Sequence, residues 1–315
     1  MTIEELKSQL SIPVIVSPMF IVSGTEMVIE ACKNGVVGSF PSLNGRTAED
    51  FEEMLKTIES ELKKFEEETG KKPAPYAVNI IVNRTNPRVQ ADLMLCAKYK
   101  VPMIITSLGA VKELVDVVHS YGGLVFHDIV KKRHAEKAME AGVDGIICVA
   151  AGAGGHAGTA NPFALVKEVR SFYDGEIVMA GSINTGADVL AARIMGADFA
   201  YMGTRFINTK ECLASDSYKQ MIIDSGIGDV IYTSGVSGVH GNFLAKSIEK
   251  AGIDVTKEKI EDFSKLSNDS DAKAWKDIWS AGHGVATIDD IPSVEELIKR
   301  LEKEYQAAKE KVSNM

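Results

Sequence analysis

The stretch AAGAGGHAG, residues 150–158, places four glycines and one histidine within nine positions, directly after an apolar run. Ordered glycine costs backbone entropy, so such a cluster marks sharp turns or backbone that lies close to a ligand. Gly154 and Gly155 can bring the main chain near a flat or charged molecule. His156 carries the side chain that can transfer a proton near neutral pH. We therefore expect a ligand-binding loop with His156 as its catalytic residue.

Two further segments, AGSINTG (180–186) and MGTR (202–205), have the composition of a phosphate site. Each follows an apolar run and leads toward a helix N-terminus, where free N–H groups and the helix dipole favour an anion. A phosphate group is therefore predicted to bind between them. The residues that we expect to contact the phosphorylated ligand here are Gly181, Ser182, Met202, Gly203 and Thr204.

Other apolar runs also end in residues that suit a ligand. Pro18 fixes the backbone after one run, and Met19 offers a soft face for stacking on a ring system. Asn79 supplies an amide that donates and accepts at once, and Thr106 and His127 close two more runs. These features fit a phosphorylated aromatic cofactor better than a phosphosugar, and flavin mononucleotide (FMN) is the simplest match. No GxGxxG follows a strand pattern and no GxxxxGK occurs, so a dinucleotide-binding domain or an NTPase is not indicated.

The elements that position these residues alternate along the chain. Helical patterns, with apolar residues three and four apart, separate short β-branched runs that are apolar throughout. Apolar strands joined by helices indicate a parallel sheet covered on both faces, and the number of units favours a (β/α)8 barrel over an open doubly wound sheet. The eight predicted strands cover residues 14–19, 35–40, 76–82, 101–108, 124–130, 145–151, 176–183 and 199–206.

The alternation breaks after the eighth strand. The segment 212–275 is too long for a barrel loop and has helix and turn signals of its own, so we expect a small, mostly helical insertion that forms a lid. The barrel would comprise residues 1–211 and 276–315, with the amphipathic segment 291–312 as its last helix. Trp275 and Trp279 share one helical face and are predicted to pack the lid on the barrel.

Composition excludes several classes of protein. The formal charge is −9 and no basic run stands out, so nucleic acid is not an expected partner. No apolar run is long enough to cross a membrane, and the N-terminal segment lacks the features of a signal peptide, so we expect a cytoplasmic protein. The cysteines are far apart without a CxxC pair, which predicts buried reduced thiols and no metal site. They are Cys32, Cys96, Cys148 and Cys212.

The motifs resemble those of a known family. The runs AGAGGHAGTANPFALVKEVR and MAGSINTGADVLAARIMGADFAYMGTRFINTKE, with SPMF near the start, are similar to the nitronate monooxygenases, long called 2-nitropropane dioxygenases. The resemblance covers nearly the whole chain and implies an FMN-containing (β/α)8 barrel with a lid after strand eight. It implies that His156 is the active-site histidine. It assigns flavin contacts to Pro18, Met19, Asn79, Gly154 and Gly155, and the phosphate to Gly181, Ser182, Gly203 and Thr204.

The chain departs from the family pattern at two places. WSAGHGV puts His283 where the family often has Gln, and the fifth strand carries Asp128 where several members have Lys. A further histidine, His240, falls within the predicted lid. Because these differences alter polarity near the mouth of the barrel, they bear on the substrate more than on the cofactor, and His240 and His283 are candidate substrate contacts.

The resemblance implies that a nitronate gives electrons to the flavin and that O2 then yields a carbonyl compound and nitrite. His156 would stabilise the anion or remove the α proton of a neutral nitroalkane. The first alternative is an NAD(P)H-dependent reductase of quinones or enoyl thioesters. A flavin-free isomerase or aldolase and a non-catalytic flavin carrier are the others. The helices would permit a homodimer, and the sequence leaves the oligomeric state open.

Overall fold

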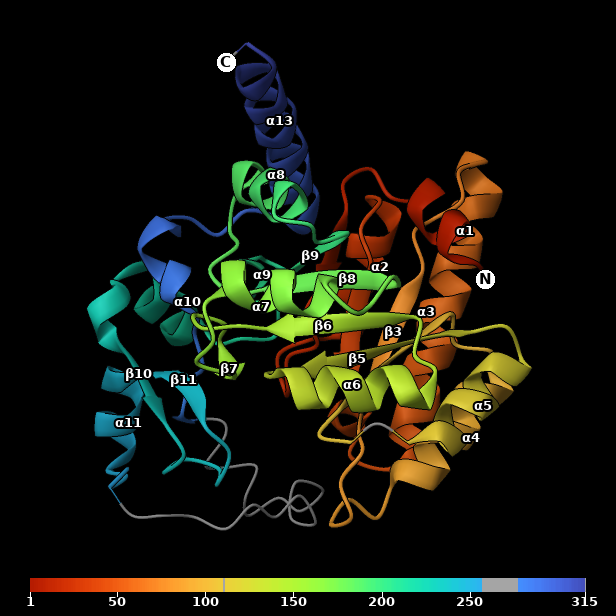
Figure 1. Ribbon diagram of the computed structural model, residues 1–315, viewed down its shortest axis with the longest axis horizontal. Coiled ribbons are helices and arrows are strands. Elements are labelled where there is room, and N and C mark those ends of the chain that lie inside the picture. The colour runs from red at the N-terminus through yellow and green to blue at the C-terminus, as the bar shows by residue number, and fades with distance from the viewer. Residues whose placement is uncertain (110, 257–276, 315) are drawn as a thin grey trace.

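The computed structural model describes residues 1–109, 111–256 and 277–314. Its centre is a ring of eight parallel strands (Figure 1). They are β1 (Val14–Val16), β2 (Gly38–Pro41), β3 (Tyr76–Ile81), β4 (Met103–Ser107), β5 (Leu124–Ile129), β6 (Gly145–Val149), β8 (Glu176–Ala180) and β9 (Phe199–Met202). Each overlaps one of the eight predicted runs, and all but β2, which extends one residue beyond its run to Pro41, lie within the run.

The strand order shows that the sheet is a barrel and not an open doubly wound sheet. Hydrogen-bonded neighbours follow the order β1-β9-β8-β6-β5-β4-β3-β2. A parallel bridge between Ile15 and Val37 then joins the two outer strands and completes the ring. All eight strands point the same way, so their carboxyl ends meet at one end of the barrel, where barrel enzymes bind their ligands.

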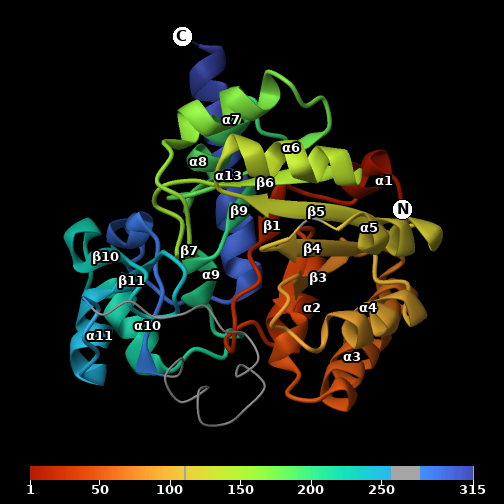
Figure 2. The ribbon, with the colours of Figure 1, turned by 60° about the horizontal axis from the view of Figure 1, so that its bottom comes forward.

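Eight helices cover the outside of the ring (Figures 1 and 2). They are α2 (Thr25–Lys33), α3 (Ala48–Thr69), α4 (Val89–Lys98), α5 (Lys112–Ser120), α6 (Lys132–Ala141), α7 (Pro162–Arg170), α8 (Gly186–Ile194) and α13 (Val294–Ser313). In α3 the buried side chains of Phe51, Leu55, Ile58 and Leu62 recur at the spacing of one helical face. Its first turn is closed by reciprocal hydrogen bonds between Thr47 and Asp50.

The last predicted helix takes its expected place in the ring. α13 packs against α8 and α2, which close the barrel on either side of it. Its crossing with α8 is so close that a Cβ on Gly186 would lie 2.0 Å from the carbonyl oxygen of Leu301. Glycine is therefore required at this contact, and the N–H of Gly186 donates to Glu304 at 2.8 Å.

Two apolar layers hold the barrel together. The inner layer fills the ring with buried side chains such as Ile105, Phe126 and Phe199. The outer layer lies between strands and helices and includes Met202.

All four cysteines are buried and free, as predicted. None of the helices in the described ranges is long and apolar enough to cross a membrane.

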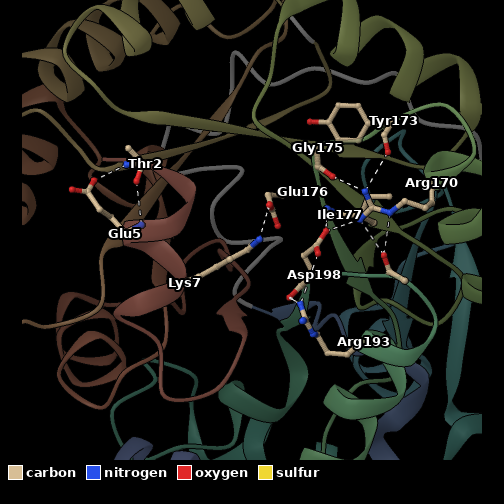
Figure 3. Close-up of polar contacts among 11 residues, drawn as sticks. Thr2, Glu5, Lys7, Arg170, Tyr173, Gly175, Glu176, Ile177, Arg193 and Asp198 are labelled. Carbon is tan, nitrogen blue, oxygen red and sulfur yellow. Dashed lines mark hydrogen bonds and ion pairs between the residues drawn. The ribbon is translucent and has the colours of Figure 1, made fainter.

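The amino end of the barrel is closed by a short helix and by charged pairs (Figure 3). Helix α1 (Ile3–Ser8) buries Leu6 against the inner layer. Lys7 donates to Glu176 at 2.8 Å. Arg170 donates to Asp198 at 2.6 Å and also to backbone carbonyls. The N–H of Ile177 donates to the carboxylate of Asp198 at 2.9 Å. The charged groups named here are therefore paired with one another, although Oε2 of Glu176 is buried and accepts no hydrogen bond from a described residue.

The insertion lies at the opposite end (Figures 1 and 2). After the short helix α9 (Thr204–Ile207) it comprises α10 (Asp216–Ile223), β10 (Val230–Thr233), β11 (Gly241–Leu244) and α11 (Ala245–Ala251). We expected a mostly helical lid, and the two strands were not anticipated. β10 and β11 are antiparallel, and β11 also pairs with β7 (Gly155–His156) from the barrel. The boundary predicted at 275/276 lies outside the described residues.

Candidate active site

A cavity of about 1110 Å³ opens at the carboxyl ends of the strands, beneath the insertion. Most of the predicted site residues line it, although they come from strands that are far apart in the sequence. They are Pro18, Met19, Asn79, His127, Gly154, Gly155, His156, Gly181, Ser182, Gly203, Thr204 and His240. The structure thus brings the expected flavin contacts, the expected phosphate contacts and the histidine into one cavity.

Three predicted residues do not line the cavity. Met202 is fully buried in the outer apolar layer, because successive residues of a strand point to opposite faces of the sheet. Thr106 lies behind His127, with its Oγ1 2.7 Å from the ring Nδ1. The backbone N–H of His283 donates to the carbonyl of Gly152 at 3.0 Å, so this residue closes the loop after β6 from outside.

The tips of β8 and β9 carry the residues that were predicted to bind a phosphate, which we call the phosphate cradle: Gly181, Ser182, Gly203 and Thr204. Gly181 and Ser182 have φ angles of 127° and 55°, so two successive residues turn away from the strand in a way that side chains disfavour. Among the described residues, the N–H groups of Ser182 and Thr204 donate to no protein acceptor. Unpaired donors beside a cavity suit a phosphate, so the residues present fit a phosphorylated cofactor.

The glycines of the loop after β6 serve the protein's own packing as well as the cavity. A Cβ on Gly154 would lie 2.9 Å from the backbone nitrogen of Gly282. Gly155 has a φ of 69° and pairs with Asn242 of β11. The expectation that these glycines serve only a close approach to a ligand is thus incomplete, because they also let the insertion and the segment after it pack on the loop.

His156 is held by the insertion. Its Nε2 lies 3.1 Å from the Oγ of Ser237. The hydroxyl of Ser237 donates to the carbonyl of Val239 at 3.1 Å, so its hydrogen is used there and Nε2–H of His156 is the donor in the contact between the two side chains. Burial lowers the pKa of His156 to about 4, so the ring is neutral at pH 7. The sequence had suggested a pKa near neutrality.

A chain of hydrogen bonds joins the tips of β3, β4 and β5. Asn79 donates Nδ2 to Ser107 at 2.8 Å and to the carbonyl of Ile105 at 3.1 Å, which leaves its Oδ1 to accept from a ligand. Ser107 in turn donates to Oδ2 of Asp128 at 2.7 Å. Oδ1 of Asp128 is buried and accepts no hydrogen bond from a described residue. Burial raises the pKa of this carboxyl to about 7, although the Ser107 hydroxyl favours the charged form.

His127, the residue before Asp128 on β5, is neutral at pH 7, as His156 is. His127 is buried against Thr106, and burial together with nearby His134 lowers its pKa to about 4. Another histidine of the cavity, His240, is exposed and stacks on Tyr232 with ring centroids 5.2 Å apart. Trp279 stacks on Tyr218 at 5.0 Å, in agreement with a packing role, and Trp275 lies outside the described residues.

Several residues in or beside the cavity were missed by sequence reasoning. Ser237 gave no signal, because its contact with His156 joins positions 81 residues apart. Lys131, His134 and Lys137 line the cavity from the loop before α6 and its first two turns. Their spacing of three along a helix was the available signal. Among the described residues, no group of three or more His, Cys, Asp or Glu side chains could hold a metal ion.

Comparison with known proteins shows the family to which the chain belongs. The nitronate monooxygenase family matches residues 40–304, and the chain belongs to this family of flavin-dependent oxidoreductases. A curated relative from Rhodococcus jostii, named (3aS,4S,5R,7aS)-5-hydroxy-7a-methyl-1-oxo-octahydro-1H-indene-4-carboxyl-CoA dehydrogenase, is 28% identical over 244 residues, which is 76% of this chain. That alignment spans 65% of the relative's own length, and the alignment with its counterpart from Mycobacterium tuberculosis spans 50%.

Two solved structures share the fold along the whole chain. FabK from Thermotoga maritima has a TM-score of 0.80 at 20% identity, over 99% of this chain and 98% of the other. Nitroalkane oxidase from Streptomyces ansochromogenes has a TM-score of 0.79 at 20% identity, over 98% and 99%. At this identity the likeness shows the (β/α)8 fold with its insertion.

Proposed function

We propose that this protein oxidises alkyl nitronates with O2, using FMN, to a carbonyl compound and nitrite. Membership of the nitronate monooxygenase family supports the reaction class. The observation that carries the proposal is the neutral His156, whose Nε2–H is held by Ser237 at the wall of a cavity that also contains an unpaired phosphate cradle. Nitronates are already anions, so a neutral hydrogen-bond donor suits them better than a base does, and the anion would replace Ser237 Oγ as the acceptor of the single Nε2–H.

The phosphate of FMN would be held by the N–H groups of Ser182 and Thr204, with Gly181 and Gly203 leaving room for it. Pro18, Met19 and Asn79 would contact the ring, and the other predicted site residues stay part of this proposal. When bound, the flavin supplies the electron transfer from the nitronate and the reaction with O2. The protein orients the anion, excludes water beneath the insertion and keeps a proton on Nε2 of His156.

A low pKa makes His156 a weak base, which sharpens the choice of substrate. Removal of the α proton of a neutral nitroalkane needs a group whose pKa lies near the working pH, and burial holds this ring well below it. We therefore expect turnover of propyl-2-nitronate at pH 7 and little turnover of 2-nitropropane, with the release of nitrite as the measurement. Equal rates with both substrates would contradict the donor role.

The second candidate is an NAD(P)H-dependent reductase of quinones or thioesters, and the size of the cavity favours it. Its volume of about 1110 Å³ exceeds the roughly 300–1,000 Å³ of a usual small-molecule site, which leaves space beside a flavin. The Rhodococcus relative, named for a carboxyl-CoA compound, makes a CoA thioester a reasonable substrate to test.

An anaerobic absorbance titration of the flavin-loaded protein separates the two candidates. Bleaching of the flavin bands by propyl-2-nitronate, with NADH and NADPH inert, supports nitronate oxidation. Bleaching by a reduced nicotinamide alone moves the protein to the reductases. A protein that binds no flavin after addition of FMN would overturn both, and a phosphorylated metabolite would then be the ligand of the cradle.

A further inference from the structure

A group of cations lies at the mouth of the cavity, away from the phosphate cradle. We call Lys131, His134 and Lys137 the basic rim, because all three line the cavity from the start of α6 and the residue before it. Residues 131–137 contain four lysines and arginines against one glutamate, in a chain whose net charge is −9. This positive patch is therefore local and faces a ligand site.

The two lysines of the rim have no counter-ion among the residues that the structure describes. Glu136 pairs with Lys132 at 3.7 Å, and Lys132 also lies over the ring of Phe172. Among the described residues, neither Lys131 nor Lys137 forms an ion pair. Burial lowers the pKa of His134, and the charges of Lys131 and Lys137 lower it further, so the cations are close enough to repel one another. No acidic residue occupies the first turn of α6 to offset them.

The rim and the cradle are separate sites within one cavity. The rim follows β5, and the cradle follows β8 and β9, with β6 between them in the ring. The loop after β6, which carries His156, therefore lies between the two positive regions. A single phosphate held at the cradle does not account for the rim, and the volume of the cavity allows a second molecule.

We propose that Lys131, His134 and Lys137 bind a phosphate group of a second ligand, which enters the cavity beside the flavin. Its chemical class is an organic molecule with a phosphate-ester arm, and the arm comes from either a nicotinamide dinucleotide or a coenzyme A thioester. The inference rests on the proposed function in one respect, because it takes the cradle to be the site of the flavin phosphate.

The test measures binding to the flavin-loaded protein with two probes that do not reduce it. NADP⁺ and coenzyme A are titrated separately by calorimetry, at low salt and at 0.3 M salt. We expect one of them to bind, and to bind more weakly at high salt because the contact is between charges. Binding of NADP⁺ identifies the arm as that of a dinucleotide, and binding of coenzyme A identifies it as that of a thioester.

Three variants locate the contact. The double variant with Lys131→Gln and Lys137→Gln should lower the affinity for whichever probe binds by about tenfold or more, since charge-assisted contacts to the phosphate are lost. Lys132→Gln is the control, because it removes one lysine charge from the same helix but outside the cavity. We expect no more than a twofold change there. His134→Gln should abolish proton uptake on binding, since an adjacent phosphate favours the charged ring.

The outcomes separate this proposal from the proposed function. If neither probe binds while the protein oxidises nitronates, the basic rim has been assigned wrongly and the function stands. Equal weakening by Lys132→Gln and by the double variant would also overturn the proposal, since a general charge effect would then explain it. If a probe binds at the rim and nitronates are not oxidised, the rim proposal holds and nitronate oxidation fails.

Discussion

Asp198 and Asp128, at opposite ends of the barrel, differ in how the fold satisfies their carboxylate oxygens. At the amino end, Asp198 accepts from Arg170 and from the N–H of Ile177, and Arg170 also satisfies the carbonyl of Gly175 (Figure 3). At the carboxyl end, Oδ1 of Asp128 is buried with no donor from a described residue, and the N–H groups of the cradle are unpaired. One carboxylate is paired within the fold, and the other is held at the edge of a cavity.

This difference separates stability from function within one sheet. A paired carboxylate contributes to folding, whereas a buried and unpaired one costs free energy until a ligand or a proton joins it. Barrel enzymes place their sites at the carboxyl ends of the strands and leave the amino ends to hold the fold together. Substitutions at the two ends should therefore have separable effects, on turnover at one end and on unfolding at the other.

The largest effect is expected at the carboxyl end, from His156→Ala. Loss of the Nε2–H donor should lower nitronate turnover by about 100-fold or more, and the midpoint of thermal unfolding should change little. Steady-state nitrite release per bound flavin measures the first, and thermal unfolding the second. His119→Ala is the control, because that ring lies on the outside of the barrel against Asp144. Turnover within threefold of the wild type would remove His156 from the reaction.

The next effect is expected at the amino end, from Asp198→Ala. Arg170 and Arg193 would lose their carboxylate, and the N–H of Ile177 its acceptor, which should cost about 1–3 kcal/mol of the free energy of unfolding after allowance for solvent exposure. Urea unfolding measures this loss, and Asp174→Ala, on the exposed surface nearby, serves as the control. Turnover per bound flavin should stay unchanged, and a large fall in it would contradict the separation of the two ends.

The sequence predicts the parts of this comparison that depend on local pattern. Continuous apolar runs such as 145–151 bury both faces of a strand, so all eight strands and the barrel could be read directly. The cradle followed from the same reading, because glycine and serine stand where β8 and β9 end. Capping pairs such as Thr185 with Asp188 likewise start α8 at the expected place.

The parts that were not predictable depend on contacts between distant segments. β7 is two residues long and has no pattern of its own, and it forms because β11 pairs with it. The Ser237 contact and the packing of Gly282 on Gly154 arise in the same way. The raised pKa of Asp128 and the lowered pKa of His156 follow from burial that only the folded chain provides. Most of the site residues predicted from sequence pattern therefore line the cavity, whereas tertiary contacts set the protonation of the groups there.

A smaller effect on stability, with a dependence on pH, is expected from Asp128→Asn. The pKa of this carboxyl is about 7 in the folded protein and 3.8 in the unfolded chain. The folded state therefore holds the proton more tightly, and its stability falls as pH rises from about 4 to about 7. The Asp128→Asn variant lacks this loss, so its free energy of unfolding should exceed that of the wild type by about 1–3 kcal/mol at pH 8.

Urea unfolding of both proteins at pH 5 and pH 8 measures this difference. His127 and His156 have lowered pKa values, so their contribution is lost as pH falls from about 6.5 to about 4, in both proteins alike. The difference in free energy of unfolding between the two proteins therefore isolates the contribution of Asp128. A constant difference between pH 5 and pH 8 would mean that this carboxyl keeps its charge in the fold, paired with a group from outside the described residues.

The smallest effect is expected from Ser237→Ala, which tests whether the insertion orients the side chain of His156. The variant removes one acceptor from Nε2 of His156, a loss of about 1 kcal/mol that corresponds to roughly fivefold in turnover if the ring orientation is used in the reaction. Ser237→Thr keeps the hydroxyl and should restore most of the rate. Ser234→Ala, in the same segment, controls for the loop itself. A rate unchanged in Ser237→Ala would mean that the barrel alone positions His156, and the carboxyl end would then resemble the amino end in fixing its own polar groups without the insertion.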